Sequence, residues 1–499
     1  METEATRSIL PLLAFALPIV AAVLTVPAQR VSEHARAALL LVVAAAVAAV
    51  ALVLAAGVAS GTVYDTYILQ LTPQIWMYLR VDAAGALFGA TVAVLWLLAL
   101  VYSLGYMREE HRLGRYYGFF ILCLSWTMGL AYAGNLLTFL IFYELFSILT
   151  YPLVVHEETP EAMAAGTKYI VYILFGGTLV LLAIVLTFFS AGVQTFTAGG
   201  ILSPETDPSM LQAIFWCFLG GFGVKAALVP LHGWVPDAHP AAPAPFSAVL
   251  SGVMVAAGSF GIIRTVFQVF GTSLLTSMGV MPYVTGVAGF TVLFAAALAV
   301  NQDNLKRRLA YSTISQMAYV VLAVSLLGPE STVGALVHIT NHAFMKGGLF
   351  LCAGLFIRRL GAYNVQQLDG AARRMPITAA CFAIACLGMI GTPPLSGFTS
   401  KWYLGLGILE AEKPWLLAVL LGGALMAAIY LLPIVYRMYF REPVITPEDR
   451  TVAESREAPA TMLGPLVAAT AITLLLGIGA SLPGMPVALA RMATDAFFH

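Results

Sequence analysis

Charged residues are scarce in this 499-residue chain: Asp, Glu, Lys and Arg make up only 10% of it, whereas 60% is hydrophobic. Soluble domains are about a quarter charged and about half apolar, so this composition excludes an ordinary globular protein. The 25 basic and 25 acidic side chains cancel, which excludes the strongly basic surface of a nucleic-acid-binding protein. The composition predicts a polytopic membrane protein.

Cysteine is also scarce, and the five cysteines form no C-x-x-C pair. Most of them lie in apolar stretches, where buried and inert thiols are expected. The sequence also lacks a phosphate-binding loop, a dinucleotide-binding fingerprint and the cysteine cluster of an iron–sulfur site. We therefore expect no cofactor and no metal. Any redox chemistry would belong to another polypeptide, so whether the chain is part of an enzyme stays open.

Long apolar runs are abundant instead. A bilayer is crossed by about 20 apolar residues. The first such run, Ile9–Val26, follows METEATRS, which is not the basic start of a signal peptide, so we expect a retained membrane helix. The segment 377–409 is too long for one straight helix and contains Pro393–Pro394, so two segments are an alternative. Apolar segments lie near 9–27, 36–59, 83–106, 117–134, 136–155, 168–190, 210–229, 245–268, 278–300, 309–327, 332–356, 377–409, 415–439 and 462–482.

These segments predict an all-α polytopic membrane protein with about 14 transmembrane helices. Cytoplasmic loops are enriched in Lys and Arg. With the N-terminus outside, most loop Lys and Arg face the cytoplasm, and the longest polar connection, 441–459, becomes a cytoplasmic loop. We expect the cell inner (cytoplasmic) membrane, with both termini on the outside face. The basic residues left outside would be Arg7, Arg80, Arg264, Lys413 and Arg491.

A few ionisable side chains nevertheless fall inside apolar segments. Each costs about 2.5–3.5 kcal/mol near the bilayer centre on insertion scales, so such residues are functional candidates. A Glu144–Lys225 pair would either hold helices together or strengthen and loosen as protons pass, and both alternatives stay open. The candidates are Glu144, Lys225, His338, His342, Lys346 and Lys401.

Proline interrupts two of the segments beside these lysines. Residues 229–245 (VPLHGWVPDAHPAAPAP) follow Lys225, and residues 391–398 (GTPPLSGF) precede Lys401. Proline breaks the helical hydrogen-bond ladder, and the freed backbone is tolerated in a membrane only where it lines protein or water. Two broken helices in two halves are typical of inverted-repeat transporters. Incidental proline kinks are the alternative.

His338, His342 and Lys346 recur every four residues in HITNHAFMKGGLF, so they share one helix face. Histidines at this spacing bind zinc in HExxH proteases, but the intervening residues here are ITN and the catalytic glutamate is absent. A proton relay fits better, because imidazole both donates and accepts a proton near neutrality. Histidines packed in the core are the remaining alternative.

The chain resembles the antiporter-like proton-translocating subunits shared by respiratory complex I, Mrp-type Na⁺/H⁺ antiporters and membrane-bound hydrogenases. The resemblance covers roughly residues 115–410. Its combination of motifs is highly specific. The motifs are LLTFLIFYELFSILTYPL, GVKAALVPLHGWVPDAHPAAPAPFSAVLSG, NLKRRLAYSTISQMAYV, HITNHAFMKGGLFLCAG and GTPPLSGFTSKWYL.

The resemblance implies two inverted five-helix repeats with broken helices 7 and 12. It divides the chain into helices 1–3 (1–114), a first repeat of helices 4–8 (115–270), a second of helices 9–13 (271–440), and a cytoplasmic loop with helix 14 (441–499). It implies other integral membrane subunits as partners, in the lipid bilayer, with H⁺ as cargo and Na⁺ as a second candidate cargo.

The resemblance also implies roles for single residues. Glu144 matches the glutamate of the fifth helix, Lys225 the lysine of the seventh, Lys346 that of the eleventh and Lys401 that of the twelfth. His338 and His342 are the neighbours of Lys346. In this scheme a polar axis carries protons between two half-channels. Further residues expected along the access routes are His232, Asp237, His239 and Ser251.

One departure concerns the eighth helix, where many relatives carry a bridging lysine or an earlier histidine. Here Ala256 and Ser251 stand at those positions. Either water together with Ser251 or Ser259 would carry protons past this position, or the two halves of the chain are less tightly connected here. The sequence thus leaves three functions open: a proton-conducting subunit of a larger complex, a stand-alone cation/proton transporter, and a conduction-impaired structural homologue. Because the chain ends soon after the last span, D-type Mrp, middle complex I and hydrogenase-type subunits are the expected subfamilies.

Overall fold

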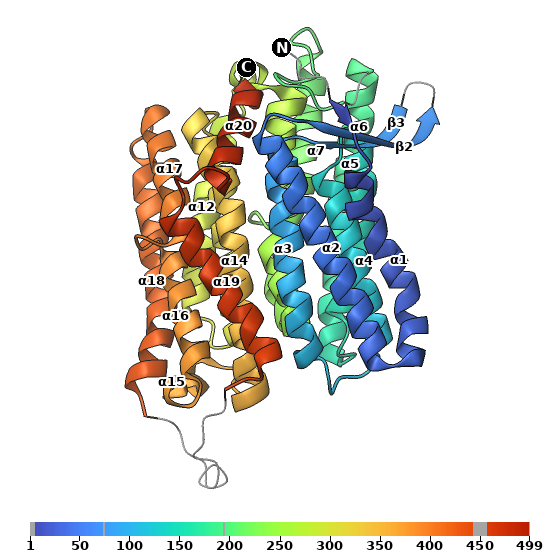
Figure 1. Cartoon of the computed structure of the whole chain (residues 1–499). Helices are drawn as coiled ribbons and strands as arrows, with labels where there is room; N and C mark the ends of the chain where they lie inside the picture. Colours follow the sequence, from blue (N-terminus) through green and yellow to red (C-terminus); the bar gives the residue numbers. More distant parts are fainter. Residues whose placement is uncertain (1–4, 73–74, 193–194, 443–456, 499) are drawn as a thin grey trace.

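The computed structural model describes residues 5–72, 75–192, 195–442 and 457–498. The long helices stand side by side as a bundle, with α1 and α18 at opposite edges and both termini at the same end (Figure 1). Most of the expected loop 441–459 lies outside the described residues. In chain order the elements are β1 (Thr6–Arg7), α1 (Leu10–Val31), α2 (Glu33–Ala59), β2 (Tyr64–Thr72), β3 (Ile75–Val81), α3 (Ala83–Tyr106), α4 (Leu113–Ala131), α5 (Leu136–Val154), α6 (Pro160–Ala191), α7 (Pro208–Lys225), α8 (Val235–Ala241), α9 (Ala244–Val249), the π-helix η1 (Leu250–Met254), α10 (Ala256–Arg264), the π-helix η2 (Thr265–Phe270), α11 (Thr272–Met278), α12 (Met281–Val300), α13 (Leu305–Val324), α14 (Pro329–Leu360), the 3₁₀-helix η3 (Val365–Leu368), α15 (Ala371–Arg374), α16 (Pro376–Ile390), α17 (Ser396–Glu410), α18 (Leu416–Phe440), α19 (Ala460–Ile478) and α20 (Pro486–Phe498).

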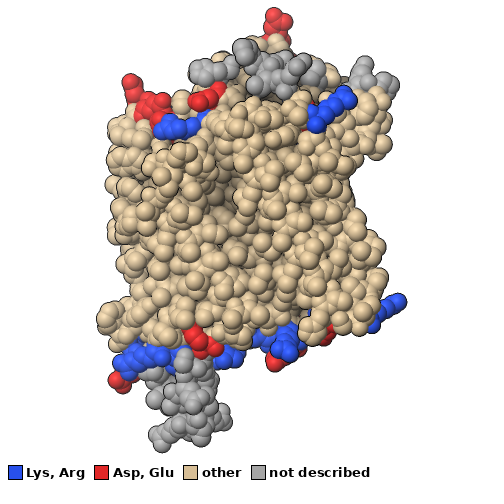
Figure 2. Space-filling view, in the orientation of Figure 1, with Lys and Arg blue, Asp and Glu red and all other residues tan. Residues whose placement is uncertain are grey.

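The helices confirm a multi-pass membrane protein. Within the described part of the chain, nine helices are long and apolar enough to cross a bilayer, with Ala244–Phe270 counted as one. In the view of Figure 2, Lys, Arg, Asp and Glu gather at the two ends of the molecule and the side between them carries none. Such a charge-free band is what the hydrocarbon core requires of a protein surface.

The expectation of an all-helical chain was wrong in one detail. A three-stranded sheet lies near the end that holds the termini, with β1 parallel to β2 and β2 antiparallel to β3 (Figure 1). Arg80 on β3 forms an ion pair of 2.7 Å with Asp65 on β2. The sheet lies outside the apolar helices, where strand edges can meet water, so it does not conflict with a membrane fold.

Side-chain caps set the starts of several helices. Asp82, Asn135 and Asn304 precede α3, α5 and α13, and each side chain accepts a hydrogen bond from a first-turn N–H. The two proline-rich stretches end helices as expected. Helix α7 stops at Lys225, and nine residues separate it from the short helix α8; Gly391 (φ +99°) lies between α16 and α17. Both breaks place a lysine next to interrupted backbone.

Helix α14 lies at the centre of the second half of the bundle. It packs against α3, α9, α13, α16, α17, α19 and α20. Consequently every residue from Ser331 to Phe356 is buried. A helix buried all round has no polar exterior, so His338, His342 and Lys346 face other helices and not lipid.

Candidate functional site

Lys225 is the last residue of α7 and is completely buried. Its Nζ donates hydrogen bonds to the Tyr169 hydroxyl on α6 (3.1 Å) and to Ser147 Oγ on α5 (3.3 Å). It also lies 4.2 Å from the centre of the Phe146 ring. Two hydroxyls and an aromatic face therefore solvate this ammonium, and three helices converge on it.

Glu144 is partly buried on α5, close enough to Lys225 for their charges to interact. No ion pair joins them in the described structure, because Lys225 donates to the two hydroxyls and Glu144 Oε1 has no hydrogen-bond partner. The carboxyl packs against Gly177 of α6, where an added Cβ would overlap it. The sequence suggested a direct ion pair between Glu144 and Lys225. In this structure the two side chains are neighbours instead, and each is positioned by its own contacts.

Lys346 lies at the middle of α14 and is also fully buried. Its Nζ donates to Ser312 Oγ on α13 (2.7 Å), with Leu309 O at 3.5 Å. The Tyr430 hydroxyl on α18 donates to the same Ser312 oxygen (2.8 Å). Lys346 is thus connected to two further helices through one serine.

The two histidines of α14 have different surroundings. His338 Nδ1 lies 2.8 Å from Ser400 Oγ on α17, and its ring centre is 6.1 Å from that of His342. His338 Nε2 and both His342 nitrogens are buried without a protein partner. Buried polar atoms require partners, and ordered water is the usual one. The neighbouring Gln316 on α13 also has an unpartnered amide.

Lys401 on α17 sits at the second helix break. Its Nζ donates to Met389 O (2.8 Å) and Ile390 O (2.9 Å), two of the last carbonyls of α16. It also lies 5.3 Å from the centre of the Tyr319 ring. A cation is stabilised at a helix C-terminus by the unpaired carbonyls, so Lys401 caps α16.

The access residues divide into two groups. Asp237 forms ion pairs with Lys168 (2.8 Å) and Arg307 (3.2 Å) at the end opposite the termini. His232, partly buried, lies against Phe294. His239 is fully buried, stacks on Phe350 of α14 at 5.0 Å, and has two unpartnered nitrogens. His239 therefore lies in the interior, as does Ser251, which is also fully buried.

A cavity of about 920 Å³ opens at this same end, between α6, α8, α13 and α14. We call it the vestibule. Its floor includes Lys306, buried, whose Nζ donates to Pro240 O (3.2 Å) and Ala242 O. In its wall, partial burial raises the pKa of Glu157, Glu110 adds to the rise, and Lys306 opposes it. Its charged lining residues are Glu110, Glu157, Glu161, Lys168, Asp237, Lys306, Arg307 and Arg358.

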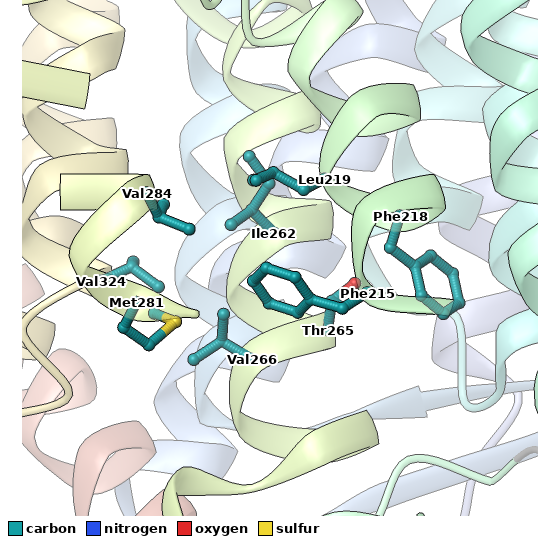
Figure 3. Close-up of a pocket in the computed structure, with 9 residues that line it drawn as sticks. All are labelled: Phe215, Phe218, Leu219, Ile262, Thr265, Val266, Met281, Val284 and Val324. Atoms are coloured by element: carbon teal, nitrogen blue, oxygen red, sulfur yellow. The ribbon is translucent and has the colours of Figure 1, made fainter. Parts of the chain in front are cut away.

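A second cavity, shown in Figure 3, has no such character. It measures about 10 Å³ and is lined by apolar side chains and Thr265. A space this size holds at most one water, and an apolar one stays dry. Among the described residues no three His, Cys, Asp or Glu side chains are arranged to hold a metal ion.

Residues 133–427, more than half of the chain, match the transmembrane family described as NADH:quinone oxidoreductase/Mrp antiporter. The chain belongs to this family. The match confirms the resemblance that the sequence motifs indicated.

Relatives in the antiporter family come from several assemblies. NADH-quinone oxidoreductase subunit N of Desulforudis audaxviator is 31% identical over 488 residues, 95% of each chain. Hydrogenase-4 component B of Escherichia coli (strain K12) is 32% identical over 425 residues, 81% of this chain but 62% of that relative. The chain therefore spans less than two thirds of the length of the hydrogenase relative.

Solved structures share the fold of this antiporter family member. A chain of an archaeal membrane-bound sulfane sulfur reductase has a TM-score of 0.86 at 24% identity, covering 99% of this chain and 98% of that one. A chain of the Mrp complex from Dietzia sp. DQ12-45-1b has a TM-score of 0.85 at 23% identity, covering 98% and 99%. The likeness extends over nearly the whole chain.

Some of the residues that hold the lysines were not predicted. Ser147, Tyr169, Ser312 and Tyr430 carry no charge and are unremarkable in a membrane sequence. Lys306 was not among the predicted site residues either, although it is buried and lines the vestibule. Serine and tyrosine hydroxyls occur throughout the helices, so only their positions distinguish these four: Ser147, Tyr169 and Ser312 accept from a lysine, and Tyr430 donates to Ser312.

Proposed function

We propose that this chain is a proton-translocating antiporter-like subunit of a multi-subunit membrane complex related to complex I. One observation carries the proposal. Lys225, Lys346 and Lys401 are buried in the bundle, and the described structure gives each of them hydroxyl or carbonyl partners and no carboxylate in an ion pair. A buried cation without a counter-ion is costly, whereas a lysine that gains and loses a proton needs no permanent counter-ion.

We propose that the chain crosses the membrane fourteen times. This count adds α4, α7, α13, α14 and the α16–α17 pair to the nine apolar spans. We also propose two inverted repeats, which would pair the break after α7 with the break after α16. The repeats would comprise residues 115–270 and 271–440. Helices 1–3 (1–114) would precede them, and helix 14 (within 441–499) would follow. A lysine lies beside each break, Lys225 before the first and Lys401 after the second, and the two broken helices support the symmetry.

The route of the proton follows the polar groups. On this proposal the vestibule, with Asp237 in its lining, admits protons from the cytoplasm, and His232 is a further access residue. Protonation of Glu144 weakens its attraction for the Lys225 ammonium, so Lys225 releases its proton more readily. Lys346 holds the proton in the middle of the second half, with His338 and His342 as relays. Lys401 passes it toward the far side.

We propose the cytoplasmic membrane as the location, with both termini outside. The end opposite the termini carries the Lys and Arg residues seen along the lower edge of Figure 2, and cytoplasmic loops are Lys- and Arg-rich. Other membrane subunits are proposed as partners, because the similar solved structures are multi-subunit complexes. The cargo is H⁺, with Na⁺ as the second candidate.

A conduction-impaired structural subunit is the second candidate function. Ala256 favours it, because the bridging lysine of the eighth helix is missing. A stand-alone transporter is the third reading. It requires that the purified single chain be stable and active.

Proton flux in vesicles that carry the assembly tests the proposal. A potassium diffusion potential is applied, and proton uptake is followed with a pH-sensitive dye. Lys225→Ala and Lys346→Ala should each lower the rate at least about a hundredfold, the order of a lost acid–base group. Lys413→Ala, in the connection between α17 and α18, is the matched control and should not change it. Unchanged flux in both buried variants, with normal assembly, would leave only a structural role.

A further inference from the structure

We propose that the hydroxyl pair Ser251–Thr313, at a π-helical turn, carries protons to Lys346 in place of the bridging lysine that Ala256 replaces. The inference rests on the proposed function and names how its two halves communicate. It concerns η1 and α10, which follow α9 without a break and pack against α13 and α14.

The hydroxyl pair is a buried contact between the two halves. Ser251 Oγ of η1 and Thr313 Oγ1 of α13 are 2.6 Å apart, and both residues are fully buried. Thr313 follows Ser312, the residue that holds Lys346. Ala256, also fully buried, has no group that can carry a proton. Ser251 thus provides this turn with a hydroxyl that is hydrogen-bonded to a residue of the other half, Thr313.

The position of the pair relative to Lys346 is set by a shared carbonyl. Leu309 O accepts a hydrogen bond from Thr313 Oγ1 at 3.0 Å and lies 3.5 Å from Lys346 Nζ. The distance from Thr313 Oγ1 to Lys346 Nζ therefore cannot exceed the sum of these two distances. One water suffices to connect a hydroxyl and an amine over such a gap.

The π-helical turn explains how Ser251 reaches this position. The Val255 N–H bonds to Leu250 O, five residues earlier, at 3.0 Å. Single π-helical turns are frequent at functional sites because they widen the helix locally. The turn packs closely on α14: a Cβ at Gly252 would lie 3.1 Å from Ala343 O, next to His342. His342, whose two ring nitrogens are unpartnered, borders the same turn.

The transfer leaves no charge on the hydroxyls. A hydrated proton from the side of Lys225 binds a lone pair of Ser251 Oγ while Ser251 gives its own proton to Thr313 Oγ1. Thr313 releases its original proton through one water to the neutral amine of Lys346. At each hydroxyl one O–H bond forms and one breaks, and the amine gains an N–H bond. Unlike a lysine, this bridge needs no buried cation on the eighth helix.

The test measures proton flux in vesicles with the whole assembly. Ser251→Ala and Thr313→Val should each lower the rate about tenfold or more, whereas Ser251→Thr and Thr313→Ser, which keep the hydroxyl, should retain it. The double variant should be no slower than the slower single variant, because the two hydroxyls act as one pair. Ser325→Ala is the matched control, since Ser325, directly after α13, is also a buried serine in a hydroxyl pair, with Thr285 Oγ1 at 2.8 Å.

A lysine restored at the missing position sharpens the test. Ala256→Lys added to Ser251→Ala should recover flux if the hydroxyl pair replaces a lysine bridge. Where that variant fails to assemble, the single variants decide. Normal flux in Ser251→Ala and Thr313→Val, with flux abolished by Lys346→Ala, would overturn this inference and leave the proposed function standing. Normal flux in Lys346→Ala as well would overturn both.

Discussion

At the scale of single residues, hydroxyls and backbone carbonyls, and not paired carboxylates, accept hydrogen bonds from Lys225, Lys346 and Lys401 in the described structure. Ser312 accepts from both Lys346 and Tyr430, so its oxygen is the only contact between that ammonium and α18 that the described structure records. A hydroxyl stabilises the ammonium less than a carboxylate does. Such an environment leaves the charged and neutral forms of lysine closer in free energy, which suits a group that must exchange protons.

Ser312→Ala should therefore slow proton flux about tenfold without unfolding the protein, because a hydrogen bond to a charged group contributes about 1.5–3 kcal/mol. Ser315→Ala is the matched control: Ser315 lies on the same helix and is buried, but its hydroxyl donates to Val292 O of α12. Equal flux in the two variants, measured in vesicles at equal protein content, would argue against a role for the serine.

Asp82 and Arg264 form an ion pair at the end that holds the termini, with Arg264 Nη2 2.8 Å from Asp82 Oδ1. Burial would raise the pKa of Asp82, but the charge and hydrogen bonds of Arg264 outweigh it and lower the pKa. The ion pair therefore contributes its full stabilisation at pH values above the pKa of Asp82 in the unfolded chain, which is about 4. This stabilisation is lost as the pH falls through the lower folded value.

Asp82→Asn should lower the free energy of unfolding at pH 7 by about 2–3 kcal/mol, because Arg264 loses its partner in a buried site. The difference from the native protein should shrink below about pH 4. Thermal unfolding of the purified assembly followed by tryptophan fluorescence measures both. Asp207→Asn, the same substitution at a helix cap without an ion pair, should have little effect. If the loss of unfolding free energy in Asp82→Asn were the same at every pH, the ion pair would not be its cause.

At the scale of helices, the sequence predicted most of the long helices within a few residues, and the two interruptions after α7 and α16. Long apolar runs and prolines act locally, so they can be read from the sequence. The hydroxyl partners could not be predicted, because Ser147 and Lys225 are 78 residues apart and Ser312 and Tyr430 are 118 apart. The π-turn at Leu250–Met254 has no sequence signature, and the β2–β3 hairpin was taken for loop.

The contact between α5 and α6 gives a prediction at this scale. A Cβ at Gly177 would overlap the Glu144 carboxyl, so Gly177→Ala should displace Glu144, cost about 1–3 kcal/mol and slow proton flux. Gly118→Ala is the matched control, since a Cβ there meets nothing within 4 Å.

In a Glu144→Ala background the same Gly177→Ala change should have little further effect on stability or flux, because the overlapping group is gone. A double-mutant cycle of thermal unfolding and flux measures this coupling. Strictly additive effects would show that Gly177 does not act through Glu144.

At the scale of the whole molecule, charge distribution predicts orientation. Helix α6 runs between Glu161, in its first turn, and the exposed Glu205 beyond its other end. With the Lys- and Arg-rich end in the cytoplasm, an impermeant maleimide added to intact cells should label Glu205→Cys and not Glu161→Cys. Disrupted cells should label both. The reverse pattern would place the termini inside.

Proton conduction through the interior is the central claim, and Lys346 tests it most directly. Lys346→Met keeps an unbranched side chain that is one atom shorter and removes the exchangeable proton. In vesicles with normally assembled complex and an imposed potential, its initial rate of proton uptake should fall at least about a hundredfold relative to the native chain. A Lys346→Met rate equal to the native rate would contradict the account.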